Sequence, residues 1–379
     1  MVIYISLRFE TNIGAKVHRS ILSELYGEDN IFTFDLRPNT PHKENNYICY
    51  GKYKNPADRI IRWIQGNSMY INDKIIQEIC NVIKNTDCEL IFFENTNFGK
   101  LIKKIKNKFP KIKVVCFYHD IDADLYKQWN RHGTLVGVIE NNIGIKQESL
   151  SQKYSDIDIV FNARDAKLYR KYYKVNPDYI IPLSTYEPSL PDFFVKAHPV
   201  PPKCKKKLIF IGSKYYPNVE GIRWFYENVL PGLNDRIELN IVGRGTEFLR
   251  TEFTDTRVHV LGTVDDVFQY LYDADIFIAP LFSGGGMKAK SIEAISLGKC
   301  FVGNDESLAG FWEEMDDTVK NQVIFNCATA EDWIQTINML SEQEIHKFNP
   351  ALYEIFLKKF SYERTKEDFR WILNIQEVK

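Results

Sequence analysis

Short apolar runs rich in β-branched residues alternate with helical patterns along nearly the whole chain. Most of these runs are continuous rather than alternating, which is typical of strands covered on both faces of a parallel sheet. In the first half the predicted strands are Val2–Phe9, Ile31–Leu36, Leu90–Glu94, Lys113–His119, Ile157–Asn162 and Tyr179–Leu183. In the second half they are Leu208–Gly212, Glu238–Gly243, Val258–Gly262, Ile276–Pro280, Cys300–Gly303 and Val323–Asn326. The pattern therefore predicts two doubly wound parallel sheets, each in a Rossmann-like α/β domain.

A proline-rich stretch marks the predicted boundary between the domains. Ser184–Lys207 holds five prolines and ends in a basic cluster, which is typical of a linker. We therefore expect an N-terminal domain over residues 1–183, a linker over 184–207 and a C-terminal domain over 208–360. Residues 361–379 have a helical apolar pattern, and we expect this helix to complete the N-terminal domain.

Composition and charge exclude several classes of protein. The net charge of -1 argues against a nucleic-acid partner, which requires a basic surface. The seven cysteines lack metal-site spacing and mostly lie in apolar runs, so we expect reduced core residues and a cytoplasmic protein. No secretion signal or membrane-spanning stretch is evident in the sequence. Lys100–Lys113 is basic and amphipathic, which fits either the wet face of a surface helix or peripheral contact with the inner face of an anionic membrane.

The segment Ile276–Gly303 carries the most informative motif of the second half. Three consecutive glycines, Gly284, Gly285 and Gly286, follow a predicted strand, and such glycines let a backbone approach a ligand closely. A predicted helix runs from Met287 to Leu297, and the next residue, a glycine, suits the position after a helix end.

Two lysines, Lys288 and Lys290, fall in the first turn of this predicted helix. Cations are unfavourable there because the helix start already carries partial positive charge, whereas an anionic ligand would reverse that penalty. The pattern therefore predicts a diphosphate site. Glu293 lies one turn further along the same face and could bind the hydroxyls of a ribose. The alternative is an ordinary glycine-rich turn with a Lys290–Glu293 salt bridge.

Three further loops leave the carboxyl ends of predicted strands, where open α/β sheets bind ligands. They are Gly212-Ser213-Lys214, Gly243-Arg244-Gly245 and Gly262-Thr263-Val264. Each loop alone is commonly just a turn, but together with Gly284–Glu293 they point to one site in the C-terminal domain.

The order FIGSKYYPNVEGIRWF, LNIVGRG and VLGTVDDVFQYLYDADIFIAPLFSGGGMKAKSIEAISLGK resembles the C-terminal domain of GT-B glycosyltransferases over Leu208–Gly310. It is most similar to the large retaining family, glycosyltransferase group 1, that includes many bacterial polysaccharide and lipopolysaccharide enzymes. The resemblance implies the GT-B fold, in which two Rossmann-like domains face a cleft, and it implies a nucleoside-diphosphate sugar as donor.

The resemblance also implies roles for individual residues. It places Glu293 on the donor ribose and Lys290 near the diphosphate. The implied donor-binding residues are Gly212, Ser213, Lys214, Arg244, Val264, Gly284, Gly285, Gly286, Met287 and Lys288. Many members carry a glutamate where this chain has Gly285, so the chain lacks a residue often placed near the donor sugar.

In the first half, His119 ends a predicted strand and Gly14 follows the first one. His119 resembles the family histidine near the transferred sugar, although a histidine that caps a strand would look the same. Gly14, within the loop Arg8–Arg19, could bring a backbone N–H to a phosphate or could form a plain turn. Trp63 could belong to the core or offer an aromatic platform to a sugar.

We therefore expect a glycosyltransferase that moves a sugar to a glycan or lipid-linked acceptor of cell-surface polysaccharide or glycoconjugate. His119, Lys290 and Glu293 are its expected catalytic residues, and we expect no metal and no other cofactor. Two alternatives remain open: a sugar-nucleotide epimerase of the same fold, and a non-catalytic GT-B subunit that binds a partner or a glycan.

Overall fold

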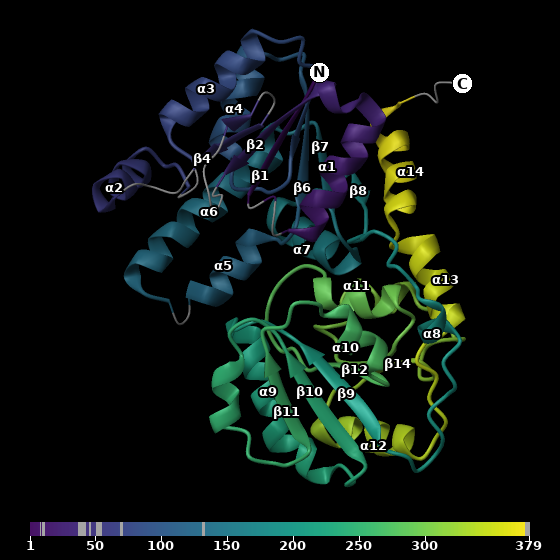
Figure 1. Cartoon of the computed structure of the whole chain (residues 1–379). Coiled ribbons are helices and arrows are strands. Elements are labelled where there is room, and N and C mark those ends of the chain that lie inside the picture. The colour runs from purple at the N-terminus through teal and green to yellow at the C-terminus, as the bar shows by residue number, and fades with distance from the viewer. Residues whose placement is uncertain are drawn as a thin grey trace. The chain divides into compact units, whose positions relative to one another are not determined.

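The computed structural model describes residues 1–7, 9, 12–36, 43–44, 47–50, 55–68, 71–130 and 133–375. The chain divides into two compact units, which are treated separately below. Unit 1 contains Met1–Ser184 and Thr365–Lys379, and unit 2 contains Thr185–Arg364. Each unit is built on a sheet with helices packed along it (Figure 1).

In the described part of unit 1 the strands form one sheet of order β3-β4-β2-β1-β5-β6-β7-β8, parallel throughout except for the β3–β4 pair. The strands are β1 Val2–Leu7, β2 Ile31–Leu36, β3 Lys43–Glu44, β4 Tyr47–Tyr50, β5 Leu90–Phe93, β6 Lys113–Tyr118, β7 Ile157–Val160 and β8 Tyr179–Ile180. Chain order reverses between β1 and β5, so the carboxyl ends of these strands flank the topological switch point where such sheets bind ligands.

The helices of unit 1 begin at well-defined caps. Asn12, Asn55, Asn72, Thr134 and Asn162 each accept a hydrogen bond from a first-turn N–H of the helix that follows. The helices are α1 Ile13–Tyr26, α2 Pro56–Ile64, α3 Asp73–Lys84, α4 Gly99–Lys108, α5 Asp122–Asn130, α6 Leu135–Tyr154, α7 Ala163–Tyr173 and the final α14 Tyr362–Leu373, with a 3-10 turn at Glu28–Asn30. Phe369 of α14 is buried, and its ring centroid lies 5.5 Å from that of Phe92. The final helix thus packs on the sheet of unit 1; its predicted last four residues, 376–379, lie outside the described part.

Unit 2 has a fully parallel sheet of order β11-β10-β9-β12-β13-β14 in the described residues. The strands are β9 Lys206–Ile211, β10 Ile237–Val242, β11 Val258–Gly262, β12 Ile276–Ala279, β13 Cys300–Gly303 and β14 Ile324–Asn326. The helices are α8 Asp192–Val195, α9 Tyr216–Asn228, α10 Phe268–Asp273, α11 Ala289–Ser296, α12 Ala330–Ser341 and α13 Pro350–Lys359, with 3-10 turns at Leu230–Gly232, Glu247–Thr251 and Trp312–Glu314. This is the Rossmann strand order, and its switch point lies between β9 and β12.

The segment predicted as a linker differs from the expectation, because most of it belongs to unit 2. Phe194 is buried, and Val200 exchanges backbone hydrogen bonds with Ile345. Lys206 is also buried, and its ammonium donates to the carbonyls of Val200 at 2.8 Å and Pro201 at 2.7 Å. The segment is thus packed on unit 2 rather than a free linker, and the division between the units falls at Ser184/Thr185.

Within the described ranges, no helix is both long enough and apolar enough to cross a membrane.

Candidate functional site

The loop between β12 and α11 lies at the switch point of unit 2. Gly284 and Gly286 have φ values of 129° and 55°, which residues with a side chain rarely adopt. The helix begins at Ala289, two residues later than predicted, because Lys288 has extended backbone at the N-cap position. Lys288 supplies no side-chain hydrogen bond to the first turn. The helix start therefore offers backbone N–H groups and a positive dipole to a ligand.

The Lys288 side chain holds the glycine loop, a role that the sequence did not predict. Its ammonium donates to the carbonyl oxygens of Gly285 at 2.8 Å and Gly286 at 3.2 Å, and to Glu306 Oε1 at 2.5 Å. The charge of Lys288 is thus balanced by Glu306, and the side chain pins the glycine loop in its left-handed conformation.

Lys290 and Glu293 lie on α11 and are both partly buried. Burial, followed by the nearby Lys288 ammonium, lowers the pKa of Lys290 to about 7, although Glu293 acts in the opposite direction. Burial likewise raises the pKa of Glu293 to about 7, against the effect of Lys290. No salt bridge within 4.0 Å joins these two described residues, so the plain surface ion pair considered above is not formed. Burial thus disfavours the charged form of both groups, and an anionic ligand beside Lys290 would favour its ammonium form.

Asn218 lies near the start of α9, and its side chain links α11 to the loop after β9. Its Oδ1 accepts a hydrogen bond from the Lys290 ammonium, and its Nδ2 donates to Ser213 O at 3.0 Å. The Lys290 ammonium also lies 5.0 Å from the centre of the Phe210 ring, which favours a cation over its face. Sequence reasoning missed Asn218 and Phe210, because 72 and more residues separate them from Lys290.

The other predicted loops meet at the carboxyl edge of the same sheet. Gly212 N donates to Val242 O at 2.9 Å, and Lys214 N donates to Arg244 O at 2.9 Å. A side chain on Gly243 would come within 2.1 Å of Gly212 O, so the close contact of the two loops requires glycine. Arg244 is exposed, whereas Val264, after β11, is partly buried. The structure therefore brings the predicted loops of unit 2 to one edge of its sheet.

The contact between α9 and the β12–α11 loop gives a first prediction. A Cβ on Gly221 would lie 1.7 Å from Pro280 O, so Gly221→Ala must push the helix or the loop away. We expect a loss of about 1–3 kcal/mol in the free energy of unfolding, measured by urea denaturation. Gly137→Ala is the control, because a Cβ there meets nothing closer than 3.4 Å. Equal stability of both variants would contradict the packing described.

In unit 1, His119 and His18 share one buried carboxylate. His119 Nε2 lies 2.6 Å and His18 Nδ1 lies 2.8 Å from Glu94 Oε1, while the Tyr4 hydroxyl donates to Oε2 at 2.8 Å. Burial alone would raise the pKa of Glu94, but the charge of His18 and hydrogen bonds from both histidines hold it well below its usual range. Glu94 and His119 directly follow the paired strands β5 and β6, whereas Tyr4 lies on β1 and His18 on α1.

Asn12 and Gly14 complete this cluster. The Asn12 amide lies 3.4 Å from His119 Nδ1, and a Cβ on Gly14 would meet His119 Cε1 at 3.5 Å. The predicted Gly14 and His119 thus lie side by side at the switch point of unit 1. Of the predicted loop before Gly14, Arg8, Glu10 and Thr11 lie outside the described residues.

The two histidines and Glu94 could also hold a metal ion, since their ligand atoms lie within 4.8 Å of one another. The histidine nitrogens are, however, 2.6 and 2.8 Å from Glu94 Oε1. Ligands around a tetrahedral zinc ion lie ~3.3 Å apart, given metal–nitrogen distances of about 2.0 Å. The spacing is that of hydrogen bonds, so the cluster would have to open to admit an ion.

Comparison with known proteins identifies the class. Over 98% of this chain and 99% of the other, the fold matches HepE of Anabaena, solved in complex with UDP, with a TM-score of 0.67 and 11% identity. It also matches the α,α-trehalose-phosphate synthase (UDP-forming) of Burkholderia vietnamiensis over 98% and 96% of the two chains, with a TM-score of 0.65 and 12% identity. At these identities the matches show the fold alone, and that fold is GT-B, as predicted.

The sequence comparisons match part of the chain to a family. Residues 205–343 match the family model of glycosyl transferases group 1. The uncharacterized glycosyltransferase MJ1069 of Methanocaldococcus jannaschii is 25% identical over 189 residues, which are 47% of this chain and 45% of that protein. The alignment thus spans about half the length of this curated relative. The resemblance of unit 2 to the glycosyltransferase group 1 family, predicted from its motifs, is thus confirmed over residues 205–343.

Proposed function

We propose that the chain transfers a sugar from a nucleoside-diphosphate sugar, such as UDP-glucose, to a hydroxyl group of a glycan or lipid-linked acceptor. The observation that carries the proposal is the β12–α11 junction. There a glycine loop with positive φ angles, a helix start and the partly buried Lys290 converge next to Glu293. The match of residues 205–343 to the family supports this assignment, and one HepE structure contains UDP-glucose.

In the proposed reaction the bond between the sugar C1 and the β-phosphate oxygen breaks, and the acceptor oxygen forms a new bond to C1. The acceptor proton passes to the departing phosphate. Lys290, the Lys214 side chain and the N–H groups at the start of α11 would stabilise the charge that develops on that phosphate, which is commonly the largest catalytic term. We propose that these groups make a metal ion unnecessary, and that the anomeric configuration is retained.

Glu293 and His119 have supporting roles in this proposal. Glu293 would accept hydrogen bonds from the ribose hydroxyls, which favours its ionised form. His119 Nε2 is 2.6 Å from Glu94 Oε1, so Nδ1, which now lies 3.4 Å from the Asn12 amide, is the nitrogen that would contact the sugar or the acceptor. Because Glu94 fixes the orientation of the ring, His119 would position substrate rather than act as a strong base.

The pH dependence of donor binding follows from Lys290 and Glu293, whose pKa values are both about 7. A diphosphate favours charged Lys290, so affinity is expected to fall as pH rises above about 7. Ribose contact favours ionised Glu293, so affinity is expected to fall below about 7 as well. Calorimetric titration with UDP-glucose between pH 5.5 and 8.5 should give a maximum near neutrality, with about tenfold weaker binding one to two units away. Glu293→Gln should remove the acidic limb alone; an unchanged curve would contradict the two roles.

A product assay tests the reaction class directly. UDP-, GDP-, ADP- and dTDP-sugars are incubated with and without a panel of glycan and lipid-linked acceptors, and the nucleotide products are separated. We expect release of nucleoside diphosphate that depends on an acceptor. Isomerised nucleotide-sugar without acceptor would instead indicate an epimerase, and binding without turnover would indicate a non-catalytic subunit.

A further inference from the structure

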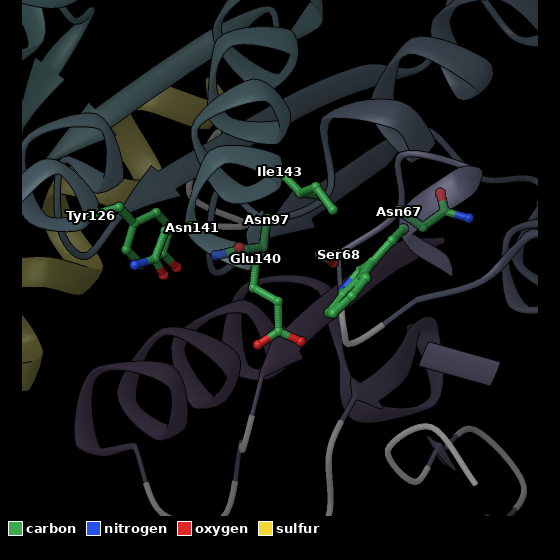
Figure 2. A pocket seen from close by; sticks show the side chains of 8 residues that line it. Asn67, Ser68, Asn97, Tyr126, Glu140, Asn141 and Ile143 are labelled. Carbon is green, nitrogen blue, oxygen red and sulfur yellow. The ribbon is translucent and has the colours of Figure 1, made fainter. Parts of the chain in front are cut away.

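A small hollow in unit 1 lies among α2, the loop after β5, α5 and α6, and its lining includes Asn67, Asn97, Tyr126 and Asn141 (Figure 2). Its free space of about 30 Å³ admits a water or two but is far too small for a sugar ring or a nucleotide. The contacts that bear on the proposed function lie instead in unit 2, in the turn that follows β13.

This turn, residues 304–307, is closed by reciprocal hydrogen bonds. Ser307 Oγ accepts from Asn304 N at 2.8 Å, and Asn304 Oδ1 accepts from Ser307 N at 3.1 Å. Both residues are buried, and a Cβ on Gly303 would lie 2.5 Å from Ser307 Oγ, so the close approach requires the preceding glycine. The turn is therefore well fixed, and it determines the place of Glu306 within it.

The same turn holds the glycine loop of the proposed donor site at both ends. Before the loop, Asn304 Nδ2 donates to Leu281 O at 2.7 Å. After the loop, the Ser291 hydroxyl of α11 donates to Ser307 O at 2.7 Å. Asn304, Ser291 and Ser307 are at most 7% exposed, so water competes little for these hydrogen bonds. Both ends of the glycine loop are thus tied to one turn.

Glu306 restrains the middle of the loop through Lys288. Its Oε1 lies 2.5 Å from the Lys288 ammonium, which also donates to the carbonyl oxygens of Gly285 and Gly286. These three bonds use all three N–H donors of the ammonium, so none is left for a phosphate while they are made. The side chains of Lys288 and Glu306 are 13% and 20% exposed, so solvent screens this ion pair less than a surface pair.

A glycine loop needs such a restraint because glycine loses more backbone freedom on ordering than any other residue. An unrestrained loop would have to become ordered whenever a ligand binds, which weakens binding, whereas a loop held beforehand avoids that cost. The ion pair acts on the loop carbonyls directly, and it is the contact of this turn that reaches Gly285 and Gly286.

We propose that Glu306 is a positioning residue of the donor site: through Lys288 it holds the glycine loop in the conformation that receives the diphosphate. The role in diphosphate binding rests on the function proposed above, whereas the restraint of the loop does not. Glu306 thus acts on donor affinity without contacting the donor, and Lys290 remains the ammonium of α11 that would bind the phosphates.

Hydrogen exchange of the glycine loop and calorimetric titration with UDP, both on the full chain, test the proposal. Glu306→Gln keeps the size of the side chain but removes the charge that holds Lys288. We expect amide exchange over residues 283–288 to become about tenfold faster and the Kd for UDP to rise about tenfold, because the loop must then be ordered on binding. Glu306→Asp, which keeps the charge on a shorter side chain, should fall between wild type and Glu306→Gln in both measurements.

Glu238→Gln is the matched control, because Glu238 forms an ion pair of 2.6 Å with Lys205 at the start of β10, at the amino edge of the same sheet. Its loop exchange and its Kd for UDP should equal those of wild type. A purely structural role of Glu306 would speed exchange throughout unit 2, including β9 and β10, whereas the proposed role confines the change to the glycine loop.

Unchanged loop exchange in Glu306→Gln, or UDP affinity equal to or tighter than that of wild type, would overturn the proposal. Tighter binding would show that the carboxylate competes with phosphate for Lys288. Failure of the proposed function gives a different result: wild type would bind no UDP, while Glu306→Gln would still speed loop exchange. In that case the restraint exists, and its role in donor binding is refuted together with the proposed function.

Discussion

Lys290→Met is expected to lower kcat/KM for sugar transfer from UDP-glucose by about 100- to 1,000-fold. The substitution keeps the length and apolar body of the side chain but removes the ammonium that donates to Asn218 and that we propose to contact the diphosphate. Removing a preorganised charge from a partly buried site lowers kcat/KM far more than removing a surface charge does. A roughly 100- to 1,000-fold decrease is typical of such a removal. The measurement is initial-rate kinetics with the acceptor found in the product assay.

Lys358→Met is the matched control, because Lys358 is exposed on α13 and, within the described part of the chain, its ion pair is with Glu354 one turn away. Its kinetics should equal those of the wild type. A loss of less than about threefold in Lys290→Met, in a protein of unchanged stability, would remove Lys290 from the catalytic machinery.

Glu94→Ala is expected to lower the free energy of unfolding by about 3–5 kcal/mol, the largest loss of stability that we predict. The carboxylate is fully buried and accepts hydrogen bonds from His18, His119 and Tyr4. Without it, three buried polar groups lose their common partner. Glu24→Ala, which removes an exposed ion pair with Lys366, is the control and should cost at most about 1 kcal/mol.

The pH dependence of the stability difference between wild type and Glu94→Ala shows whether the charge of Glu94 matters. A variant that only lost side-chain volume would differ from wild type equally at every pH. The pKa of Glu94 is held well below its ordinary value of 4.5, so its contribution to stability is complete above about pH 4.5 and declines as pH falls further. Urea denaturation at pH 7 and at pH 3.5 should therefore show a smaller difference between wild type and Glu94→Ala at the lower pH. A constant difference would contradict the charged cluster.

The strands were predictable because burial on both faces of a parallel sheet leaves a continuous apolar run in the sequence. Ile31–Leu36, Val258–Gly262 and Cys300–Gly303 have the bounds that the pattern predicts. Strand β4, Tyr47–Tyr50, was missed because it is short and lies near the sheet edge. A strand in that position has only a weak apolar run in the sequence.

The candidate site was predictable only where one continuous motif carries it. The glycines and Lys290 could be read from their order along the chain. Asn218 and Glu306 could not, since their contacts with Lys290 and Lys288 join distant segments. The start of α11 was placed too early because the extended backbone of Lys288, fixed by the glycine-loop carbonyls, leaves no local signal.

The role of Trp63 could not be predicted from the sequence, for a different reason. The sequence left it between core residue and sugar platform, because its spacing within α2 fits both. In the structure the indole N–H is buried without a hydrogen-bond partner among the described residues, and the ring centre lies 5.2 Å from the Arg59 guanidinium carbon.

A crystal structure of the protein with bound UDP would test the account most directly. We expect the diphosphate at the β12–α11 junction, with the Lys290 ammonium and first-turn N–H groups of α11 within hydrogen-bonding distance of phosphate oxygens and Glu293 on the ribose. UDP bound elsewhere, with Lys290 still held by Asn218 alone, would contradict it.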